Sequence, residues 1–349
     1  MSNASHHSSF DGEGQDQQSD DLTNTILTTI HIIFAILGIV GNGLVLVVIA
    51  FIKDLQDVTN LYIANQSLID FMTSLFLLFG YVIPVPALPE DRPTLSRFLC
   101  AFWYTKYPFW STIVASCLNL AVITFERYVA VAFPIHYRIN TISRKAIAVT
   151  FIPWIAGFLF QISLLCFSKV EDGLCLEFLW PDEATKKGIC LATYFLEFLI
   201  PVTSMVYVYA RILRELRRSG KQISQPSNTS SAPAGTEPKV LGRIAADYRT
   251  KARKNIIKTL ATVSICFVIC MSLNQHIYLA YGFGFDLDFG GPMYITSVVM
   301  AFGNIWINPL IYTFQYERFQ KGIKKLFCRP HITAQHLHVK VISNQSGRI

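Results

Sequence analysis

Seven stretches of this chain are apolar over a length that can cross a lipid bilayer, and this pattern constrains the fold most strongly. An α-helix needs about 20 residues to span the hydrocarbon core. Hydrophobic residues fill 52% of the 349 positions and charged residues only 15%, against about 25% in an ordinary soluble domain. The pattern predicts an all-α membrane bundle over residues 26–315. The expected spans are 26–52, 61–86, 99–131, 146–167, 190–216, 252–281 and 292–315.

The distribution of basic residues orients these spans. Six of the 30 Lys and Arg residues fall on the side of the membrane that holds the N-terminus, and 24 fall on the other side. Because basic residues are enriched on the cytoplasmic side, we expect an extracellular N-terminus and a multi-pass protein of the plasma membrane. Topology then accounts for the net charge of +7, so the lipid bilayer is an expected partner and nucleic acid is not.

Two polar segments lie outside the spans and differ from them in composition. Residues 1–25 are polar and acidic, which predicts a disordered extracellular tail. This tail carries a glycosylation sequon at Asn3. Residues from about 219 to 238 are rich in Ser, Pro and Gly and predict a flexible third inner loop.

The segment after the last span combines apolar and basic side chains at helical spacing. Residues 316–328 therefore predict a short amphipathic helix on the inner membrane surface. Cys328 at its end is a candidate palmitoylation site. Residues 329–349 are expected to form a cytoplasmic tail. The cysteines show no Cys-x-x-Cys spacing, so no metal site is expected.

The third span is the expected axis of the bundle, because it joins an aromatic outer end to a charged inner end. Phe109, Ile113 and Ser116 fall on roughly one helical face with Arg127. The span ends in Glu126-Arg127-Tyr128. Charged groups at the end of a membrane helix are costly unless they have partners or a function.

Polar side chains within the spans are functional candidates for the same reason. Asp70 lies in the middle of the second span, and we expect partners from neighbouring spans, namely Asn42, Ser116, Asn304 and Asn308. This set would either bind a small hard cation such as sodium or form a hydrated hydrogen-bond cluster. Glu197 would meet a cationic ligand group or a tyrosine hydroxyl. His276 would be a pocket wall or a satisfied polar residue.

Prolines and cysteines add further constraints. Pro201 and Pro309 lie inside spans and permit kinks, because each removes a backbone hydrogen bond. The extracellular side is oxidising, so Cys100 is expected to form a disulfide with Cys175 in the middle of an outer loop. Cys166 and Cys190 are the alternative partners, and both lie at predicted helix ends.

This set of residues resembles the rhodopsin-like (class A) G-protein-coupled receptors over roughly residues 25–328. A lone Glu-Arg-Tyr is a weak signal, but a complete set with one motif in each expected helix is specific. The matching motifs are Gly41-Asn42, Asn65-x-x-Leu68-x-Asp70, Glu126-Arg127-Tyr128, Trp154, Pro201 with Tyr209, and Asn308-Pro309-Leu310-Ile311-Tyr312.

The resemblance implies roles for these positions. Glu126 would hold Arg127 at rest and release it to a heterotrimeric G protein, with arrestin and a receptor kinase as further partners. Asp70 and its partners would form a sodium pocket, and Cys100 and Cys175 the outer disulfide. The implied coupling and switch residues are Glu126, Arg127, Tyr128, Tyr209, Asn308, Pro309 and Tyr312.

The chain departs from the family pattern in its sixth span and before its third. Met271 replaces the usual tryptophan and Leu273 the usual proline, so the helix should be straighter than in other members. Arg253 stands where many members carry an acid that clamps the arginine of the third helix. The spacing from Cys100 to Arg127 is two residues longer than usual, which predicts an altered start to the third helix.

The expected ligand pocket is aromatic with an uncharged floor. Phe109 stands where amine receptors carry an aspartate, which argues against a monoamine unless Glu197 substitutes. The acidic outer loops would steer a basic peptide toward the pocket. The expected lining residues are Phe109, Trp110, Ile113, Thr193, Tyr194, Glu197, Met271, Asn274, Gln275, Tyr278, Val298 and Phe302.

Other classes of seven-helix protein fit less well. A retinal-based light sensor needs a lysine in the last span, and residues 292–315 contain none. A transporter usually shows internal repeats, which this chain lacks. We therefore predict a receptor without enzymatic activity that converts an extracellular peptide-like ligand into G-protein activation. The alternative that stays open is a receptor-like protein with weak, constitutive or no coupling, because of Met271 and Leu273.

Overall fold

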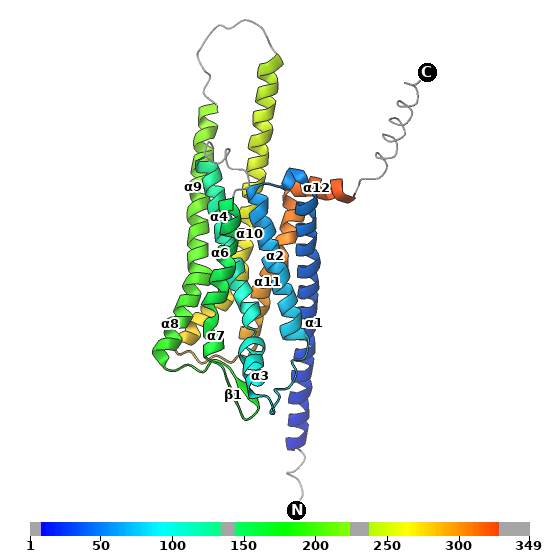
Figure 1. Ribbon diagram of the computed structural model, residues 1–349, viewed down its shortest axis with the longest axis vertical. Coiled ribbons are helices and arrows are strands. Elements are labelled where there is room, and N and C mark those ends of the chain that lie inside the picture. The colour runs from blue at the N-terminus through cyan, green and yellow to red at the C-terminus, as the bar shows by residue number, and fades with distance from the viewer. Residues whose placement is uncertain (1–7, 134–143, 224–236, 328–349) are drawn as a thin grey trace, which may run out of the picture.

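The structure, a computed structural model, describes residues 8–133, 144–223 and 237–327. Within these ranges, seven helical segments are long and apolar enough to cross a membrane, so the predicted all-α bundle is confirmed (Figure 1). The third and fifth segments begin earlier than expected. The seven segments are Leu22–Phe51, Val58–Val82, Pro93–Ala132, Arg144–Cys166, Glu183–Arg214, Lys254–Gly282 and Pro292–Gln315.

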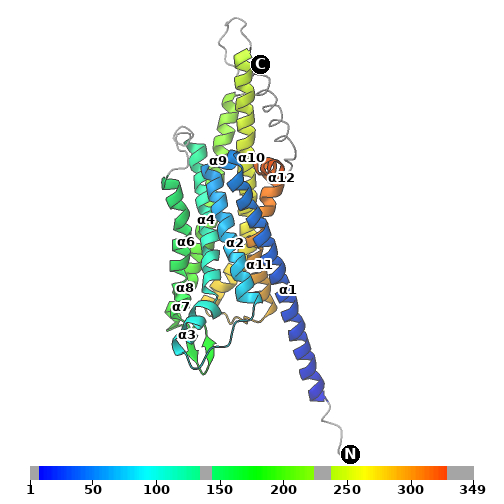
Figure 2. The same cartoon turned by 45° about the vertical axis from the view of Figure 1, so that its right-hand side comes forward.

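The helices lie side by side, and three of them extend past the bundle. Helix α1 (Ser8–Phe51) projects from the end that holds the N-terminus, as Figures 1 and 2 both show. Helices α9 (Ile200–Ile223) and α10 (Glu237–Gly282) project together from the opposite end. Helix α12 (Glu317–Phe327) lies across that same end, where the amphipathic helix was expected.

Helix α1 and helix α9 cover more of the chain than expected. The chain is helical from Ser8, whereas disorder was expected over residues 1–25. Once the apolar span has formed a helix, each further residue adds a hydrogen bond without a new nucleation cost, so the helix extends outward into the polar segment. Helix α9 continues to Ile223, into the segment expected to be a flexible loop. Asn3 lies outside the described residues.

The third span is interrupted, although it was expected to be one helix. It consists of α3 (Pro93–Phe98), the π-helical turn η3 (Leu99–Tyr104) and α4 (Tyr107–Ala132). Pro108 explains the break, because it has no N–H to donate to the Tyr104 carbonyl four residues earlier. Lys106 adopts a left-handed conformation (φ 55°), and its Nζ donates to that carbonyl at 3.0 Å. The altered start predicted from the long Cys100–Arg127 spacing is found here.

A second proline sets the shape of the fifth span. Pro201 cannot donate to the carbonyl of Glu197, and the π-helical turn η4 (Phe195–Leu199) lies just before it, between α8 (Glu183–Tyr194) and α9. By contrast, α10 runs without interruption through Met271 and Leu273, as expected for a sixth span without proline.

Small residues let two helices of the bundle approach closely. Gly157 of α6 (Arg144–Phe160) faces α4, and a Cβ at this position would lie 2.4 Å from the Ser111 carbonyl oxygen. Close contacts through small residues are a main source of helix association in membranes. The opposite face of α6 exposes large apolar side chains suited to lipid, namely Phe151, Ile152, Ile155 and Leu159.

Further elements complete the second and seventh spans and the outer end of the bundle. Helix α2 (Val58–Leu77) continues into the π-helical turn η2 (Leu78–Val82), and α11 (Pro292–Gln315) forms the seventh span. The short helix α7 (Ile162–Cys166) leads to an antiparallel hairpin of β1 (Lys169–Glu171) and β2 (Leu174–Leu176). The hairpin lies at the end of the bundle from which α1 projects (Figure 1).

Candidate functional site

A small buried cavity lies between α4, α7, α8, α10 and α11. Its volume is about 60 Å³, which suits a small group rather than a whole ligand. Six of its side chains are aromatic, and a few polar groups face inward, a common composition for a ligand site. The lining residues are Trp110, Gln161, Ser163, Leu164, Phe178, Trp180, Ile189, Thr193, Glu197, Asn274, Gln275, Tyr278, Phe289 and Tyr294.

Glu197 is the acid of this cavity. It lies in the π-helical turn η4 and is only 2% exposed. Its carboxylate accepts hydrogen bonds from Gln275 Nε2 at 2.8 Å and from Gln161 Nε2 at 3.3 Å. A tyrosine hydroxyl was one of the two partners considered for Glu197, and these two amides take its place. Because both partners are neutral, the carboxylate favours a ligand group that donates hydrogen bonds or carries positive charge.

The segment after β2 closes this cavity from outside. Phe178 has a left-handed backbone (φ 59°), and its ring stacks on Phe289 with a centroid distance of 5.9 Å. Trp180 Nε1 donates to the Tyr281 hydroxyl at 3.1 Å. The predicted disulfide between Cys100 and Cys175 is confirmed, and it tethers β2 to η3. Sequence reasoning missed Phe178 and Trp180, because the disulfide and not helical periodicity decides where this loop lies.

Half of the predicted pocket residues line the cavity, and half do not. Those that line it are Trp110, Thr193, Glu197, Asn274, Gln275 and Tyr278. Five others are packed in the hydrophobic core, namely Phe109, Ile113, Met271, Val298 and Phe302. The ring centroids of Phe109 and Phe302 are 4.9 Å apart, and both rings contact Tyr81. Aromatic packing therefore fills the space that was expected to be the floor of the ligand pocket.

The remaining predicted pocket residue, Tyr194, packs on His276 instead. The ring centroids are 5.3 Å apart, and the Tyr194 hydroxyl lies 3.3 Å from His276 Nε2. His276 Nδ1 lies 2.6 Å from the Ser272 carbonyl oxygen. Of the two roles considered for His276, the structure shows the satisfied polar residue.

The surroundings of two acids in the outer segments shift their pKa values in opposite directions. Glu177 follows β2 and is half-buried; burial raises the pKa of its carboxyl, and Lys106 opposes part of that rise. Asp182 is exposed and caps α8 by accepting a hydrogen bond from the Thr185 backbone at 2.7 Å. This bond and a second one from the Thr185 side chain lower the pKa of Asp182.

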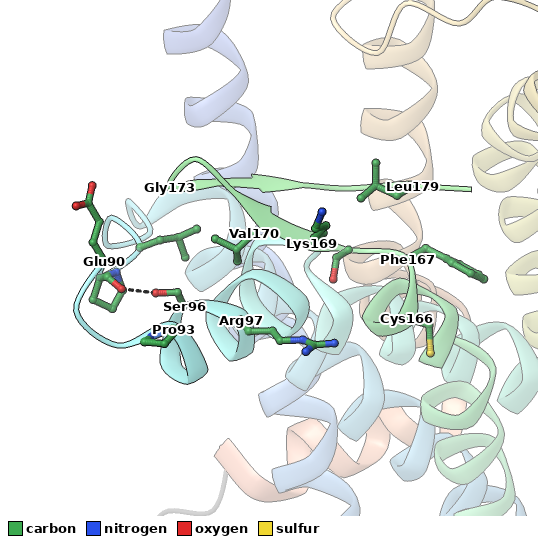
Figure 3. Close-up of a pocket in the computed structure, with 13 residues that line it drawn as sticks. Glu90, Pro93, Ser96, Arg97, Cys166, Phe167, Lys169, Val170, Gly173 and Leu179 are labelled. Carbon is green, nitrogen blue, oxygen red and sulfur yellow. Dashed lines mark hydrogen bonds between the residues drawn. The ribbon is translucent and has the colours of Figure 1, made fainter. Parts of the chain in front are cut away.

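A second, larger cavity of about 720 Å³ lies outside the helix bundle, between α3 and the hairpin (Figure 3). Arg97 and Lys169 contribute positive charge to it, and Glu90 one negative charge. Ser96 Oγ donates to the Pro89 carbonyl at 2.5 Å and holds the loop before α3 against that helix. Sequence reasoning did not predict this cavity, since it depends on how the hairpin folds back over α3.

The polar core around Asp70 contains a residue that sequence reasoning missed. The Asp70 carboxylate accepts hydrogen bonds from Ser116 Oγ at 2.8 Å and from Asn308 Nδ2 at 3.0 Å. Gln66 Nε2 lies 3.1 Å from each carboxylate oxygen. Asn42 and Asn304 were expected beside Asp70. Asn42 instead donates to the Gly38 and Ile305 carbonyls, and no hydrogen bond joins Asn304 to Asp70 in the described residues.

The inner end of α4 holds a buried ion pair. Arg127 Nε donates to Glu126 Oε2 at 2.6 Å, and a second contact joins the guanidinium to Glu126 Oε1. The two side chains are 9% and 7% exposed. Thr59 of α2 donates to Glu126 at 3.2 Å and accepts a hydrogen bond from Arg127. This link between α2 and the pair was not predicted.

The other predicted switch residues lie around this inner end. Tyr128 is half-buried and packs on Val131, Val208, Ile212 and Ile257. The hydroxyls of Tyr209 and Tyr312 are buried without a hydrogen-bond partner in the part of the chain that the structure describes. Pro309 lies inside α11 and packs close to Gly41 of α1. The Arg253 side chain is outside the described residues.

Ion pairs and an amide fasten the inner-surface helix. Arg318 pairs with Asp57 at 2.7 Å, and Lys325 pairs with Asp54 at 3.0 Å. Asn255 of α10 donates to the Gln315 carbonyl at 2.8 Å and accepts from the backbone N–H at the start of α12. These contacts hold the junction of α11 and α12 against the inner half of α10. Cys328 lies outside the described residues.

A seven-helix bundle with a ligand-type cavity near one end and a buried charged pair at the other is the architecture of a membrane receptor. The chain matches the family described as 7 transmembrane receptor (rhodopsin family) over residues 41–312. The protein belongs to this family, which confirms the resemblance seen in the motifs.

Individual relatives agree with this assignment. The chain is 28% identical to galanin receptor type 1 of Rattus norvegicus over 321 residues, covering 87% of this chain and 82% of that receptor. It is 27% identical to the KiSS-1 receptor of Mus musculus over 305 residues, covering 84% and 72%. The crystal structure of squid rhodopsin shares the fold, with a TM-score of 0.68, 21% identity, and coverage of 88% of this chain and 86% of rhodopsin.

Proposed function

We propose that this chain is a plasma-membrane receptor with an extracellular N-terminus, which binds a peptide-like ligand and activates a heterotrimeric G protein. The single observation that carries this proposal is the buried Glu126–Arg127 pair at the inner end of α4. The same helix contributes Trp110 to the cavity near its other end. One rigid element therefore reaches both sites.

The cavity supports a ligand that inserts one polar group. Its volume of about 60 Å³ is too small for a peptide, so most of a peptide would contact the roof formed by Phe178 and Trp180. The inserted group would reach Glu197, whose carboxylate is held by two neutral amides. The similarity to receptors named for galanin and KiSS-1 supports a peptide over a monoamine.

Coupling between the two ends would work through a shift of population. A ligand favours whichever bundle conformation it binds more tightly, and a G protein that favours the same conformation raises ligand affinity reciprocally. In the described conformation Arg127 is engaged by Glu126 and Thr59, which corresponds to a closed inner face. Release of this pair would expose the guanidinium to the partner.

The proposal is tested by nucleotide exchange in membranes from cells that express the receptor. Pools of synthetic peptides are added, and exchange is recorded with several purified G proteins. We expect at least one basic or amidated peptide to raise exchange. Arg127→Ala should abolish that response and leave ligand binding in place, because Trp110 and Glu197 are unchanged.

The matched control is Arg144→Ala, which removes an exposed arginine at the inner end of α6. This variant should respond like the natural receptor. Full ligand-driven exchange by Arg127→Ala, at equal surface expression, would refute the role of Arg127. High exchange without ligand, unchanged by every pool, would instead support the alternative of a constitutive receptor.

A further inference from the structure

Gln66 lies where the family resemblance implies a sodium ion. It stands one helical turn before Asp70 on α2 and is fully buried. Its Nε2 lies 3.1 Å from both carboxylate oxygens of Asp70, so it bridges them as a cation bound by both oxygens would. The same nitrogen lies 2.6 Å from Ser116 Oγ. An amide N–H₂ carries partial positive charge and two hydrogens, which suits it to this position.

A chain of hydrogen bonds fixes which end of the Gln66 amide faces Asp70. The indole Nε1 of Trp154 can only donate, and it donates to Asn65 Oδ1 at 3.1 Å. Asn65 Nδ2 then donates to Asn119 Oδ1 at 2.9 Å, and Asn119 Nδ2 donates to Gln66 Oε1 at 2.8 Å. With its oxygen engaged in this way, Gln66 must present its nitrogen to the carboxylate. Reversing any one amide would place two acceptors or two donors together.

The Asp70 carboxylate is consequently saturated by neutral donors. Gln66, Ser116 and Asn308 together supply hydrogen bonds to both oxygens. A cation that shared these oxygens would sit beside the N–H groups of Gln66 and Asn308, and its charge would repel their hydrogens. The residues present therefore do not fit a resident sodium ion.

The buried part of α11 also contains amide oxygens that lack a hydrogen-bond partner. Asn304 Oδ1 and Asn308 Oδ1 are buried and have no hydrogen-bond partner in the described residues. Hard cations bind carboxylate, hydroxyl and amide oxygens. Without the Gln66 amide, the two oxygens of Asp70, the Ser116 hydroxyl and the Asn308 amide oxygen would be left as such a ligand set.

We propose that the Gln66 side chain replaces the sodium ion in this receptor, so that the receptor does not respond to sodium. The chemistry of the ion site is otherwise retained, and loss of the Gln66 amide restores it. This proposal does not depend on the identity of the ligand or the G protein.

Thermal unfolding of the purified full-length receptor in detergent tests the proposal, with sodium chloride and choline chloride compared at about 0.15 M, where screening by salt is matched. The natural receptor should melt at the same temperature in both salts. Gln66→Leu should melt several degrees higher in sodium than in choline, because an ion that binds only the folded state stabilises it. Gln66→Ala is the second variant, in case leucine packs poorly.

The control adds Asp70→Asn to the Gln66→Leu variant, which removes the charge and should abolish the sodium effect. A sodium-specific rise in the melting temperature of the natural receptor would overturn the proposal directly. A folded Gln66→Leu or Gln66→Ala receptor without any sodium effect would also overturn it, because Gln66 would then not be what excludes the ion.

Discussion

Glu126→Gln should raise nucleotide exchange in the absence of ligand, if the described pair holds the inner face closed. The substitution keeps the size of the side chain and one of its acceptors, but it removes the charge that Arg127 faces. Both side chains are less than one-tenth exposed, so water screens the pair only weakly. Thr59 retains its place beside the pair in this variant.

The size of the effect follows from the contacts. Hydrogen bonds to charged groups contribute about 1.5–3 kcal/mol each, and neutral ones about 0.5–1.5 kcal/mol. The amide still accepts from the charged guanidinium, but the opposite charge and one acceptor atom are lost, which should destabilise the closed conformation by about 1–2 kcal/mol relative to the open one. This corresponds to a factor of roughly 5–30 in the equilibrium between them. Basal exchange should rise by a similar factor while the open form remains the minor one.

The assay is exchange of a labelled nucleotide on a purified G protein, with receptor quantified at the cell surface. Asp54→Asn is the matched control, because Asp54 also forms an inner ion pair, at 3.0 Å with Lys325, but its side chain is 77% exposed. Exposed pairs contribute about 0–1 kcal/mol, so this variant should leave basal exchange unchanged. Equal basal exchange in Glu126→Gln and the natural receptor would show that the Glu126–Arg127 pair does not hold the inner face closed.

Three further predictions concern stability, measured as melting temperature in detergent. Gly157→Ala should destabilise the bundle by about 1–3 kcal/mol through overpacking against α4, whereas Gly188→Ala, which has open space around it, should not; equal melting would contradict this. Cys100→Ser opens a loop with a sequence separation of 75 and should cost up to about 4.5 kcal/mol in the chain-entropy estimate, while Cys166→Ser, which removes a free thiol, should melt normally. Burial raises the pKa of Glu177 above its ordinary 4.5. Between pH 4.5 and the raised pKa, the folded state binds more protons than the unfolded state, so stability falls as the pH rises through that window. Glu177→Gln should flatten this part of the stability–pH profile, and an unchanged slope would exclude Glu177 as its source.

Hydropathy was enough to predict the bundle, and the high cost of intramembrane charge singled out the inner pair. The outer disulfide was predicted from the oxidising outer side and the position of Cys175 in the middle of a loop. A buried Asp70 or Arg127 needs partners wherever the chain places it, so its importance can be recognised without coordinates. The Cys100–Arg127 spacing predicted an altered start to the third span, but it did not predict that the helix breaks before α4, although Pro108 is visible in the sequence. A proline near the start of a helix and one within it have different effects, and only the position of the first turn decides between them.

The pocket and the polar core were predicted less well, for a different reason. Helical spacing indicates which face of α4 points inward, but not which side chains along that face meet a neighbour. Phe109 meets Phe302 and closes the space that it was expected to line. Gln66 carries no charge to single it out, and its role depends on the direction of its amide, which four other side chains determine.

The left-handed residue at Lys106 has a mechanical consequence for how the outer end of the receptor moves. The disulfide anchors the hairpin to η3 on one side of this joint, while Trp110 and Arg127 belong to α4 on the other side. Because Lys106 interrupts the helix, α4 is not continuous with the turn that carries the disulfide. A rotation of α4 about its own axis would therefore not have to be transmitted to the hairpin through an unbroken helix.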